Sequence, residues 1–584
     1  MNRLLFFTLF ASLLYPDAEA RLLGAQSCFN LNVRCGFMRM HAHHVKADKT
    51  CETKCVNWAK FISLSSQGWK CGKCPQCFNS KEELKKSVDL VVARKPYVEA
   101  LLGSKYGWPI GQWCFTENVT DMSSIFEGAT EFTADLSEWD TSHVTNMHSM
   151  FAQANNFISD LSLWNVSNVQ DMGSMFYAAN RFYSDLSAWD TSSVTNMNGM
   201  FNEAHDFTSD IGSWDVSKVQ DMREMFLIAL SFDSDLSGWD TSSVTDMSKM
   251  FMYASAFRGN ISPWDVSRVE NMDWMLAYTE RLDSDLSGWD TSSVTSMYSM
   301  FQGASRFDGT LSDWSVAKVS NMGGMFAYSG AVEWDLSGWD TSSVTDMSEM
   351  FYQASNFNSD LSAWNVSSVQ NMGRMFQEAL LFTSDLSKWN TSAVTDMREI
   401  FHVASSFNSD INEWDVSNIQ DMAYLFADAN AFHSELSKWD TSAVTDMSWM
   451  FYEARSFHGD VGSWDVSQVQ DMTSMFYDAL LFQSDLSGWD TSSVTKMNWM
   501  FGYASSFNSD ISSWDVSALE DMQAMFYNAS VFDKNLCEWG IHLQGRSVVT
   551  SDWDVPIVFS NTACPNSTSP DLSRNPPGPL CHNC

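Results

Sequence analysis

Cysteine is missing from the long middle of this 584-residue chain, because none occurs between Cys114 and Cys537. The middle must therefore fold without disulfides. Eight cysteines lie before it and four after it, and even counts at both ends are typical of disulfide-stapled caps in an oxidising compartment, with a connectivity that the sequence leaves open. The expected disulfide cysteines are Cys28, Cys35, Cys51, Cys55, Cys71, Cys74, Cys77, Cys114, Cys537, Cys564, Cys581 and Cys584.

Positive charge is also scarce, and it is unevenly placed. The chain has 34 Lys and Arg against 72 Asp and Glu, a formal net charge of -38, which excludes nucleic acid as a partner of the whole molecule. Residues 21–114 hold 15 basic and 6 acidic residues, whereas residues 115–584 hold 18 and 64. One end is therefore basic and the rest acidic, and the basic end is expected to dock on the acidic part of another copy or on an acidic polysaccharide.

Long apolar runs are absent after the first twenty residues, so no transmembrane segment is predicted. Residues 1–20 place Arg3 before an apolar run and end in small residues, the layout of a signal peptide cleaved near Ala20. We therefore expect a secreted protein, extracellular or associated with a cell surface. Seven N-x-S/T sequons are candidate glycosylation sites on that route: Asn118, Asn165, Asn260, Asn365, Asn390, Asn528 and Asn566.

The sequence between the two Cys-containing ends is a repeat of constant length, without insertions. Tryptophan recurs every 25 residues from Trp139 to Trp539, and methionine recurs at the same step from Met122 to Met522, seventeen times each. Stacked identical coils explain this period, since an extra residue in one coil would break the stack. The predicted domains are a signal peptide (1–20), a Cys-rich basic cap (21–114), a solenoid of about 17 repeats (115–540) and a Cys-containing cap and tail (541–584).

Each coil shows two patterns in succession. Met147, Met150, Phe151 and Ala154 have the spacing of an apolar helical stripe. The following S-D-L-S-x-W segment is too short for another helix, so we assign it to a strand that pairs in parallel with its neighbours. The predicted fold is an α/β repeat solenoid, leucine-rich-repeat-like, with one short parallel strand and one short helix per coil. Successive coils also alternate, for example Thr141 and Val166 in one column.

The repeated phrase W-D-x-S-x-V-x-D-M-x-x-M-F-x-x-A-x-x-F-x-x-D-L-S-x-W resembles the repeat of BspA-type leucine-rich-repeat surface proteins. The resemblance covers residues 115 to 540 and leaves the Cys-rich ends uncovered. It implies a solenoid on an extracellular or cell-surface protein, from a family largely without an assigned biochemical activity.

Several site types have a simpler structural explanation. The tryptophan column is expected to be core and not a sugar-binding ladder, because seventeen exposed indoles would form a very large apolar patch. Asp135 and Asp140 begin acidic columns in which Asn often replaces Asp, so turn capping is favoured and calcium is the alternative cofactor. Histidines 41, 43 and 44 with the C-x-x-C-x-x-C motif suggest zinc, but disulfides are favoured and no metal site is predicted.

No catalytic residue is predicted, because the sequence contains no nucleophile–base pair, phosphate loop or H-E-x-x-H motif. We therefore expect a non-enzymatic structural or adhesive element. Its expected partners are other copies of itself, an extracellular protein or a polysaccharide. The alternative is a monomeric recognition module that binds one protein or glycan through variable coil residues. The candidate partner-binding residues are Tyr424, Trp449, Trp499, Tyr452 and Tyr477.

Overall fold

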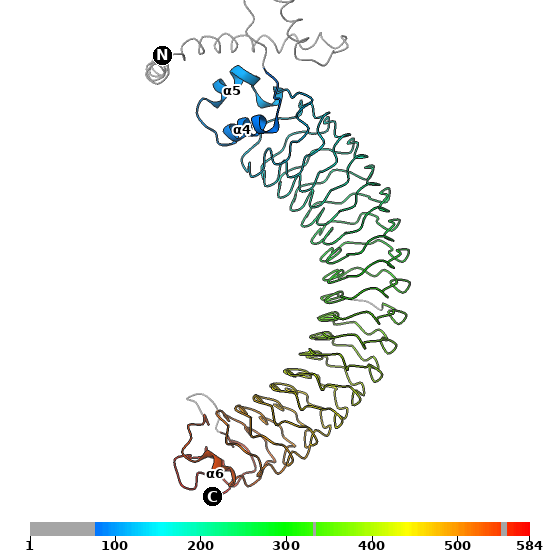
Figure 1. Ribbon diagram of the computed structural model, residues 1–584. Coiled ribbons are helices and arrows are strands. Elements are labelled where there is room, and N and C mark those ends of the chain that lie inside the picture. Colours follow the sequence, from blue (N-terminus) through cyan, green and yellow to red (C-terminus); the bar gives the residue numbers. More distant parts are fainter. Residues whose placement is uncertain (1–75, 331–333, 551–557) are drawn as a thin grey trace, which may run out of the picture. The chain divides into compact units, whose positions relative to one another are not determined.

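The structure is a computed structural model that describes residues 76–330, 334–550 and 558–584. The signal peptide, the histidine cluster and cysteines 28, 35, 51, 55, 71 and 74 lie outside the described residues. The chain forms two compact units, Met1–Asp210 and Ile211–Cys584, and each contains stacked coils of 25 residues (Figure 1). None of the described helices is both long enough and apolar enough to cross a membrane.

The amino-terminal cap of the first unit consists of α4 (Lys81–Val92), α5 (Val98–Tyr106) and the 3-10 helix η2 (Ile110–Gln112). Ser80 caps α4 by accepting a hydrogen bond from the Glu83 N–H. The disulfide Cys77–Cys114 joins the two ends of the cap. The cap substitutes for a preceding coil, because the indole of Trp139 donates to the Ile110 carbonyl at 3.0 Å.

The backbone of each coil bonds alternately within the coil and to the next one. In the M-x-x-M-F segment of the first unit, Met147 N–H donates to Asp171 O of the next coil at 2.8 Å, and Phe151 N–H donates to Met175 O at 2.9 Å. Between them, Met150 N–H donates to Met147 O in its own coil at 3.1 Å. The same alternation recurs in the second unit, so the coils are joined by main-chain hydrogen bonds in a parallel register.

The predicted helix in each coil is wrong. Within the described residues of the repeat array, the M-x-x-M-F segment forms consecutive turns, and a helix appears only at its end, as α6 (Trp539–Leu543). Non-glycine residues with a positive φ recur in this segment, such as Ser149 at 54° and Gln153 at 59°. A left-handed residue interrupts the i to i−4 hydrogen bonding of an α-helix. The N–H of Ser149 itself donates to Gly173 O of the neighbouring coil at 2.8 Å.

The predicted parallel pairing between coils is present, but not where or to the extent that we expected. Among the described residues, the repeat coils pair through isolated parallel bridges such as Asp121–Asn146 and Asp446–Asp471, and no extended strand is formed. These bridges lie just before each M-x-x-M-F segment and not in S-D-L-S-x-W, which forms a turn at its end. The α/β content of the predicted coil is therefore replaced by turns and single bridges.

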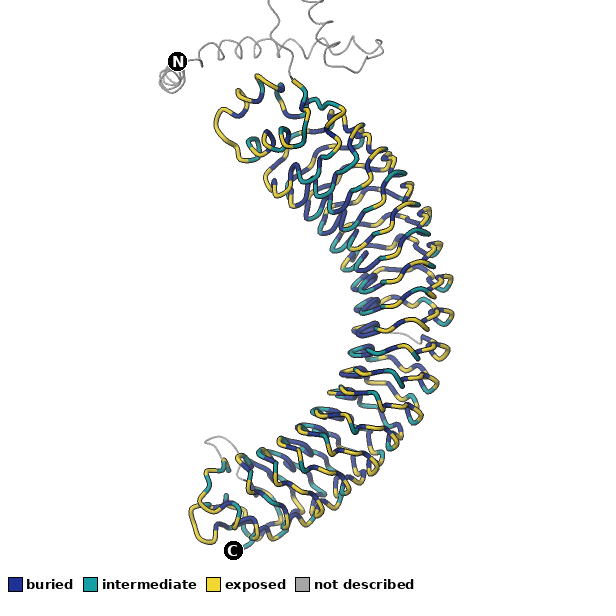
Figure 2. Tube along the Cα trace, viewed as in Figure 1, coloured by how far each residue is buried: buried dark blue, intermediate teal, exposed yellow. Residues whose placement is uncertain are grey.

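The core is made of the repeated apolar columns. Tryptophans of the repeat have 1–4% of their surface exposed, and the Met and Phe columns are buried with them. Figure 2 shows buried residues recurring from coil to coil. Indoles of the repeated column also form hydrogen bonds between coils: Trp164 Nε1 donates to Leu136 O of the previous coil at 3.0 Å. The same carbonyl accepts the Trp139 N–H, so one oxygen joins two coils. The prediction that these tryptophans are core residues is confirmed.

The alternation of Thr and Val has a hydrogen-bonding cause. Thr141 is buried, and its hydroxyl donates to Asn165 O of the next coil at 2.8 Å. The equivalent residue of that next coil, Val166, is equally buried and has no hydroxyl to donate. Thr241 repeats the arrangement in the second unit, donating to Asp265 O at 2.9 Å. The 50-residue period therefore pairs a polar and an apolar version of the same turn.

The carboxy-terminal cap covers the last coil of the second unit. Met522 N–H donates to Val549 O at 3.0 Å and Phe526 N–H to Val558 O at 3.0 Å, the bonds that a further coil would accept. The ring of Phe559 stacks on Phe526 at 5.5 Å. Two disulfides, Cys537–Cys584 and Cys564–Cys581, join the segments of this cap.

Backbone strain at a branched residue gives one testable stability effect. Val403 has a φ of 59°, a conformation that β-branched side chains strongly disfavour and asparagine tolerates. We expect Val403→Asn to raise the free energy of unfolding by about 1 kcal/mol, measured by chemical denaturation. Val531→Asn is the matched control, because Val531 is 43% exposed and has no positive φ, and it should leave stability unchanged. Equal effects of the two substitutions would contradict the strain argument.

Candidate functional site

The variable residues of the M-x-x-M-F-x-x-A segment lie between its buried residues and remain partly exposed. Tyr424, Trp449 and Trp499 each have a φ of 58–60°. Their N–H groups donate to the next coil, and for Trp449 the acceptor is Thr473 O at 2.8 Å. The backbone therefore sets the spacing of these side chains from coil to coil, independently of any contact that their rings make.

The five predicted binding residues lie next to one another in the second unit. The rings of Tyr424 and Trp449 are stacked with centroids 5.5 Å apart and planes 6° apart. Trp449 contacts Tyr452 at 4.8 Å, and Tyr452 stacks on Tyr477 at 4.9 Å. Trp499 meets Tyr477 edge-on at 5.8 Å. The structure thus joins residues from two sequence columns into one continuous cluster.

Three further residues extend this cluster and were missed from the sequence. Tyr503 contacts Tyr477 at 5.2 Å, Tyr527 contacts Tyr503 at 5.3 Å, and His402 lies 5.6 Å from Tyr424 at the other end. His402 and Tyr527 lie in the repeat column of Tyr452 and Tyr477, so following that column in both directions would have found them, whereas Tyr503 lies in a third column. We call the partly exposed set the aromatic ladder, defined as Tyr424, Trp449, Tyr452, Tyr477, Trp499, Tyr503 and Tyr527.

Carboxylates surround the aromatic ladder and influence its ionisation. Burial raises the pKa of Tyr452, with further contributions from the neighbouring Glu453 and Asp428, so its phenol stays protonated and can donate a hydrogen bond. Burial also raises the pKa of Asp428, and the negative charge of Glu453 adds to that effect. The pKa of His402 is lowered, mainly by burial, which favours a neutral imidazole. The surface therefore combines neutral aromatic groups with negative charge.

A second aromatic group occupies earlier coils of the same unit. Tyr253 and Tyr278 are stacked at 4.4 Å, and Trp274 meets Tyr298 edge-on at 5.4 Å. Trp274 has the same position in its repeat as Trp449, with a φ of 58°. This group supplies matched controls for substitutions in the aromatic ladder.

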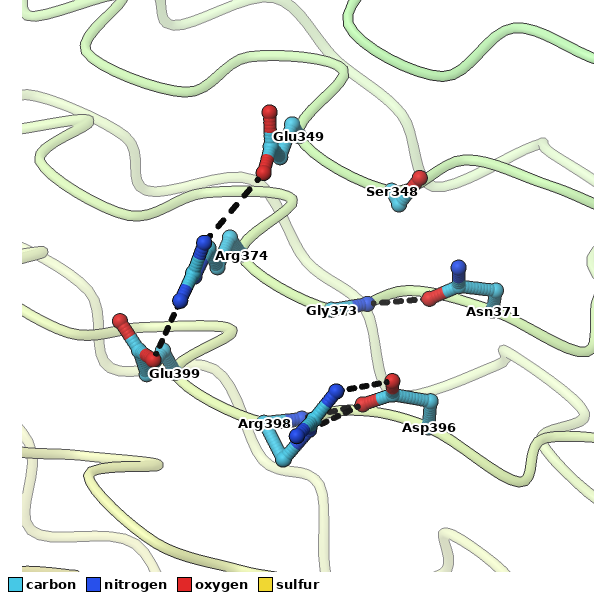
Figure 3. Close-up of a pocket in the computed structure, with 8 residues that line it drawn as sticks. All are labelled: Ser348, Glu349, Asn371, Gly373, Arg374, Asp396, Arg398 and Glu399. Atoms are coloured by element: carbon cyan, nitrogen blue, oxygen red, sulfur yellow. Dashed lines mark hydrogen bonds and ion pairs between the residues drawn. The ribbon is translucent and has the colours of Figure 1, made fainter.

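Ion pairs line a shallow pocket, which is shown in Figure 3. Its residues, 348–399, lie between the two aromatic groups in the sequence. Arg374 lies 3.5 Å from Glu349 and 3.0 Å from Glu399, and the side chain of Arg398 makes two hydrogen bonds to Asp396. Each of the two arginines is thus paired with a carboxylate. Arg374 lies between carboxylates of the preceding and following coils, so we assign these ion pairs a role in joining successive coils.

The two predicted acidic columns are turn caps. Asp135 Oδ1 accepts the Ser137 N–H at 2.9 Å, and Asp140 Oδ1 accepts the Ser142 N–H at 3.1 Å. Asn390 takes the same role by accepting the Ser392 N–H at 3.2 Å, which explains why the columns accept either residue. The favoured interpretation of these columns is confirmed, and calcium stays a prediction without a test.

One group of potential metal ligands is found among the described residues, formed by Asp533, Cys581 and His582. Cys581 is bonded to Cys564, so its sulfur is not available as a thiolate ligand. His582 Nε2 lies 3.1 Å from Asp533, which accounts for the arrangement as an ion pair within the carboxy-terminal cap.

The turn caps lead to an expected dependence of stability on pH. The Ser387 N–H and hydroxyl lower the pKa of Asp385, and many aspartates of the columns share this shift. A carboxyl with a lowered folded pKa contributes stability above its unfolded pKa of about 3.9 and loses it as the pH falls through the folded pKa. Burial raises the pKa of Asp421, Asp428 and Asp521. These three carboxyls therefore oppose the loss of stability on acidification.

We therefore expect the urea midpoint, followed by tryptophan fluorescence, to be level from about pH 7 to 5 and to fall below about pH 4. Asp385→Asn keeps the oxygen acceptor but removes the charge, so it should reduce the slope slightly. A midpoint that rises on acidification would contradict the assignment of these carboxylates.

The predicted glycosylation sites differ in exposure. Five of the seven asparagines are exposed: Asn118, Asn165, Asn260, Asn365 and Asn390. Asn528 and Asn566 are partly exposed, and their side chains bond to Asn561 at 2.8 Å and Asn583 at 3.2 Å. Modification of the seven stays a prediction, with the first five the more accessible.

The stacked coils of each unit define a repeat-solenoid protein. The chain belongs to the family described as "Mycoplasma protein of unknown function, DUF285". Matches to this family run from residue 103 to residue 547 in overlapping segments: 103–193, 160–244, 182–288, 231–338, 271–388, 328–438, 380–487 and 458–547.

Other comparisons add little to this assignment. The search of curated proteins gave no match. Among solved structures, the chain is similar to one described as a crystal structure of a TLR13–ssRNA13 complex, with 10% sequence identity and a TM-score of 0.15. That similarity covers 73% of this chain and 81% of the other, and at this TM-score it supports no argument about function.

Proposed function

We propose that this chain is a secreted, non-enzymatic repeat protein that acts as an extracellular or cell-surface adhesive element through the aromatic ladder. The partner is an extracellular protein, a polysaccharide or another copy of the chain. Kinship with BspA-type surface proteins is part of this proposal and rests on the repeated W-D-x-S-x-V-x-D-M motif.

One observation carries the proposal. Seven aromatic side chains from five successive coils contact one another while remaining partly exposed. The core already contains its own Trp, Phe and Met columns, so the ladder is not needed to fill it. Tyr and Trp on a surface provide large contact areas with polar tips, and such residues dominate the binding energy of many interfaces.

Secretion is supported by the three described disulfides, Cys77–Cys114, Cys537–Cys584 and Cys564–Cys581, which are typical of an oxidising compartment. The signal-like residues 1–20 agree with that assignment.

The test is the binding of the full-length protein to an array of extracellular polysaccharides and matrix proteins. We expect Trp449→Ser/Trp499→Ser to weaken binding to any retained target about 30-fold or more, the loss of a hot-spot contact of about 2 kcal/mol. Trp274→Ser is the matched control, because Trp274 has the same repeat position outside the ladder. Equal binding by the wild type and the ladder variant would contradict the proposal.

A further inference from the structure

We propose that the aromatic ladder is the docking surface for the basic segment 21–75 of a second copy of this chain, so that copies join head to tail. The inference rests on the proposed function, since it names the partner of the same ladder. Three observations carry it: the charge around the ladder, the different charge around the second aromatic group, and the composition of the amino-terminal segment.

Acidic residues dominate the coils that hold the ladder. Residues 421–528 contain 16 Asp and Glu but 3 Lys and Arg. One of those cations, Arg455, already pairs with Glu453 at 2.9 Å and with Asp478 at 2.8 Å. Within the described part of the chain, the carboxylate of Asp428 has no ion pair, although it lies beside the ladder. A cationic partner would supply the missing charge.

The second aromatic group has a weaker negative charge. Residues 246–352 contain 15 acidic and 6 basic residues over almost the same length of chain. One of its cations also shares the repeat column of Trp274, because Lys249 precedes Trp274 by 25 residues, and it pairs with Glu224 at 3.1 Å. A basic partner is therefore attracted more strongly to the aromatic ladder than to this group.

The amino-terminal segment has the complementary composition. Residues 21–75 contain nine Lys and Arg and two acidic residues, together with the apolar rings of Phe29, Phe37, Trp58, Phe61 and Trp69. The remaining chain from residue 115 onward is strongly acidic, with 64 acidic and 18 basic residues. The segment 21–75 is therefore the part of this chain that matches both the charge and the apolar character of the ladder.

The geometry of such a contact determines how copies assemble. The basic segment and the ladder are different surfaces, so a docked copy leaves its own ladder free for a further copy. Such a heterologous contact grows by adding copies and does not stop at a symmetric dimer. This gives an adhesive element a way to extend.

Sedimentation velocity of the full-length protein, with its disulfides intact, tests the proposal. In about 0.01 M salt, where the Debye length is about 30 Å, the wild type should sediment faster as concentration rises, and in about 1 M salt it should be monomeric. The ladder variant Trp449→Ser/Tyr452→Ser and the segment variant Lys46→Glu/Lys49→Glu/Lys54→Glu should each be monomeric in low salt.

Mixing the two variants gives the sharpest result. The intact basic segment of the ladder variant should dock on the intact ladder of the segment variant, so the mixture should form dimers and nothing larger. Trp274→Ser/Tyr278→Ser controls for loss of surface aromatics, and Arg268→Glu/Lys318→Glu/Lys388→Glu controls for the same change of net charge. Both controls should associate like the wild type.

Three results would overturn the inference: a wild type that stays monomeric in low salt, a ladder variant that associates like the wild type, or a mixture without dimers. A monomeric wild type that still binds an array target through Trp449 would overturn self-docking and leave the proposed function standing. A wild type that binds no array target but still associates through the ladder would show that the ladder binds only other copies of the chain.

Discussion

Replacing Trp389 by alanine is expected to lower the free energy of unfolding of the second unit by about 3–5 kcal/mol. Trp389 has 3% of its surface exposed, and it lies 6.1 Å from Trp414 and 6.2 Å from Phe376. Its indole also donates to Leu361 O of the previous coil at 3.1 Å. Alanine would leave a cavity at a contact between coils. Chemical denaturation, monitored by hydrogen exchange, measures the loss of stability.

Trp389→Phe separates packing from hydrogen bonding. Leu361 O still accepts the Trp364 N–H at 3.1 Å, so the lost indole bond should cost about 1 kcal/mol. The expected order of stability is therefore wild type, phenylalanine, alanine. Trp449→Ala is the surface control, since that ring lies outside the core, and an effect as large as that of Trp389→Ala would refute the assignment of the repeated tryptophans to the core.

Removal of the carboxy-terminal cap is expected to make the protein aggregate. A chain that ends at Gly540 loses the carbonyls of Val549, Val558 and Ser560, which accept N–H groups of the last coil, and also the ring of Phe559. The exposed end then presents unpaired backbone groups beside an apolar surface, which promotes association of chains. Size-exclusion chromatography and dye binding to apolar surface measure the outcome.

The matched control removes one disulfide and keeps the covering residues. Cys537→Ser/Cys584→Ser in the full chain opens a link across 47 residues and should cost about 2–4 kcal/mol of local stability. That variant should remain monomeric in about 1 M salt, whereas the truncated chain, carrying Cys537→Ser to avoid a free thiol, should not. A truncated chain that stays monomeric and stable would show that the last coil needs no cover.

The strict period of the sequence was sufficient to predict the solenoid, its register and its core. Every coil must contact the next through the same residues, so the columns of Trp, Met and Phe could only be core residues. The helical stripe of Met147, Met150, Phe151 and Ala154 identified the buried residues correctly, although no helix forms there. The spacing of apolar residues reports which side chains are buried and does not fix how the intervening backbone bonds.

The sequence predicted the candidate site only in part, because it shows the columns of aromatic residues and does not show which rings touch. The sequence showed aromatic residues in two variable columns, and five of the seven ladder residues follow from it, whereas Tyr503 and Tyr527 were missed. Whether rings in different columns touch depends on the distance between coils and on the direction of each side chain. The positive φ of Trp449 and Trp499, which no propensity of tryptophan predicts, sets that direction.

The sequence by itself determined the repeat length, the core columns, the charge division and the positions of the caps, because these depend on composition and spacing alone. Only the tertiary structure decided the alternating hydrogen bonds, the replacement of helix and strand by turns, the Thr hydroxyl bonds of alternate coils and the continuity of the aromatic ladder. Each of these depends on atoms of the neighbouring coil, about 25 residues away along the chain, where local propensities have no influence.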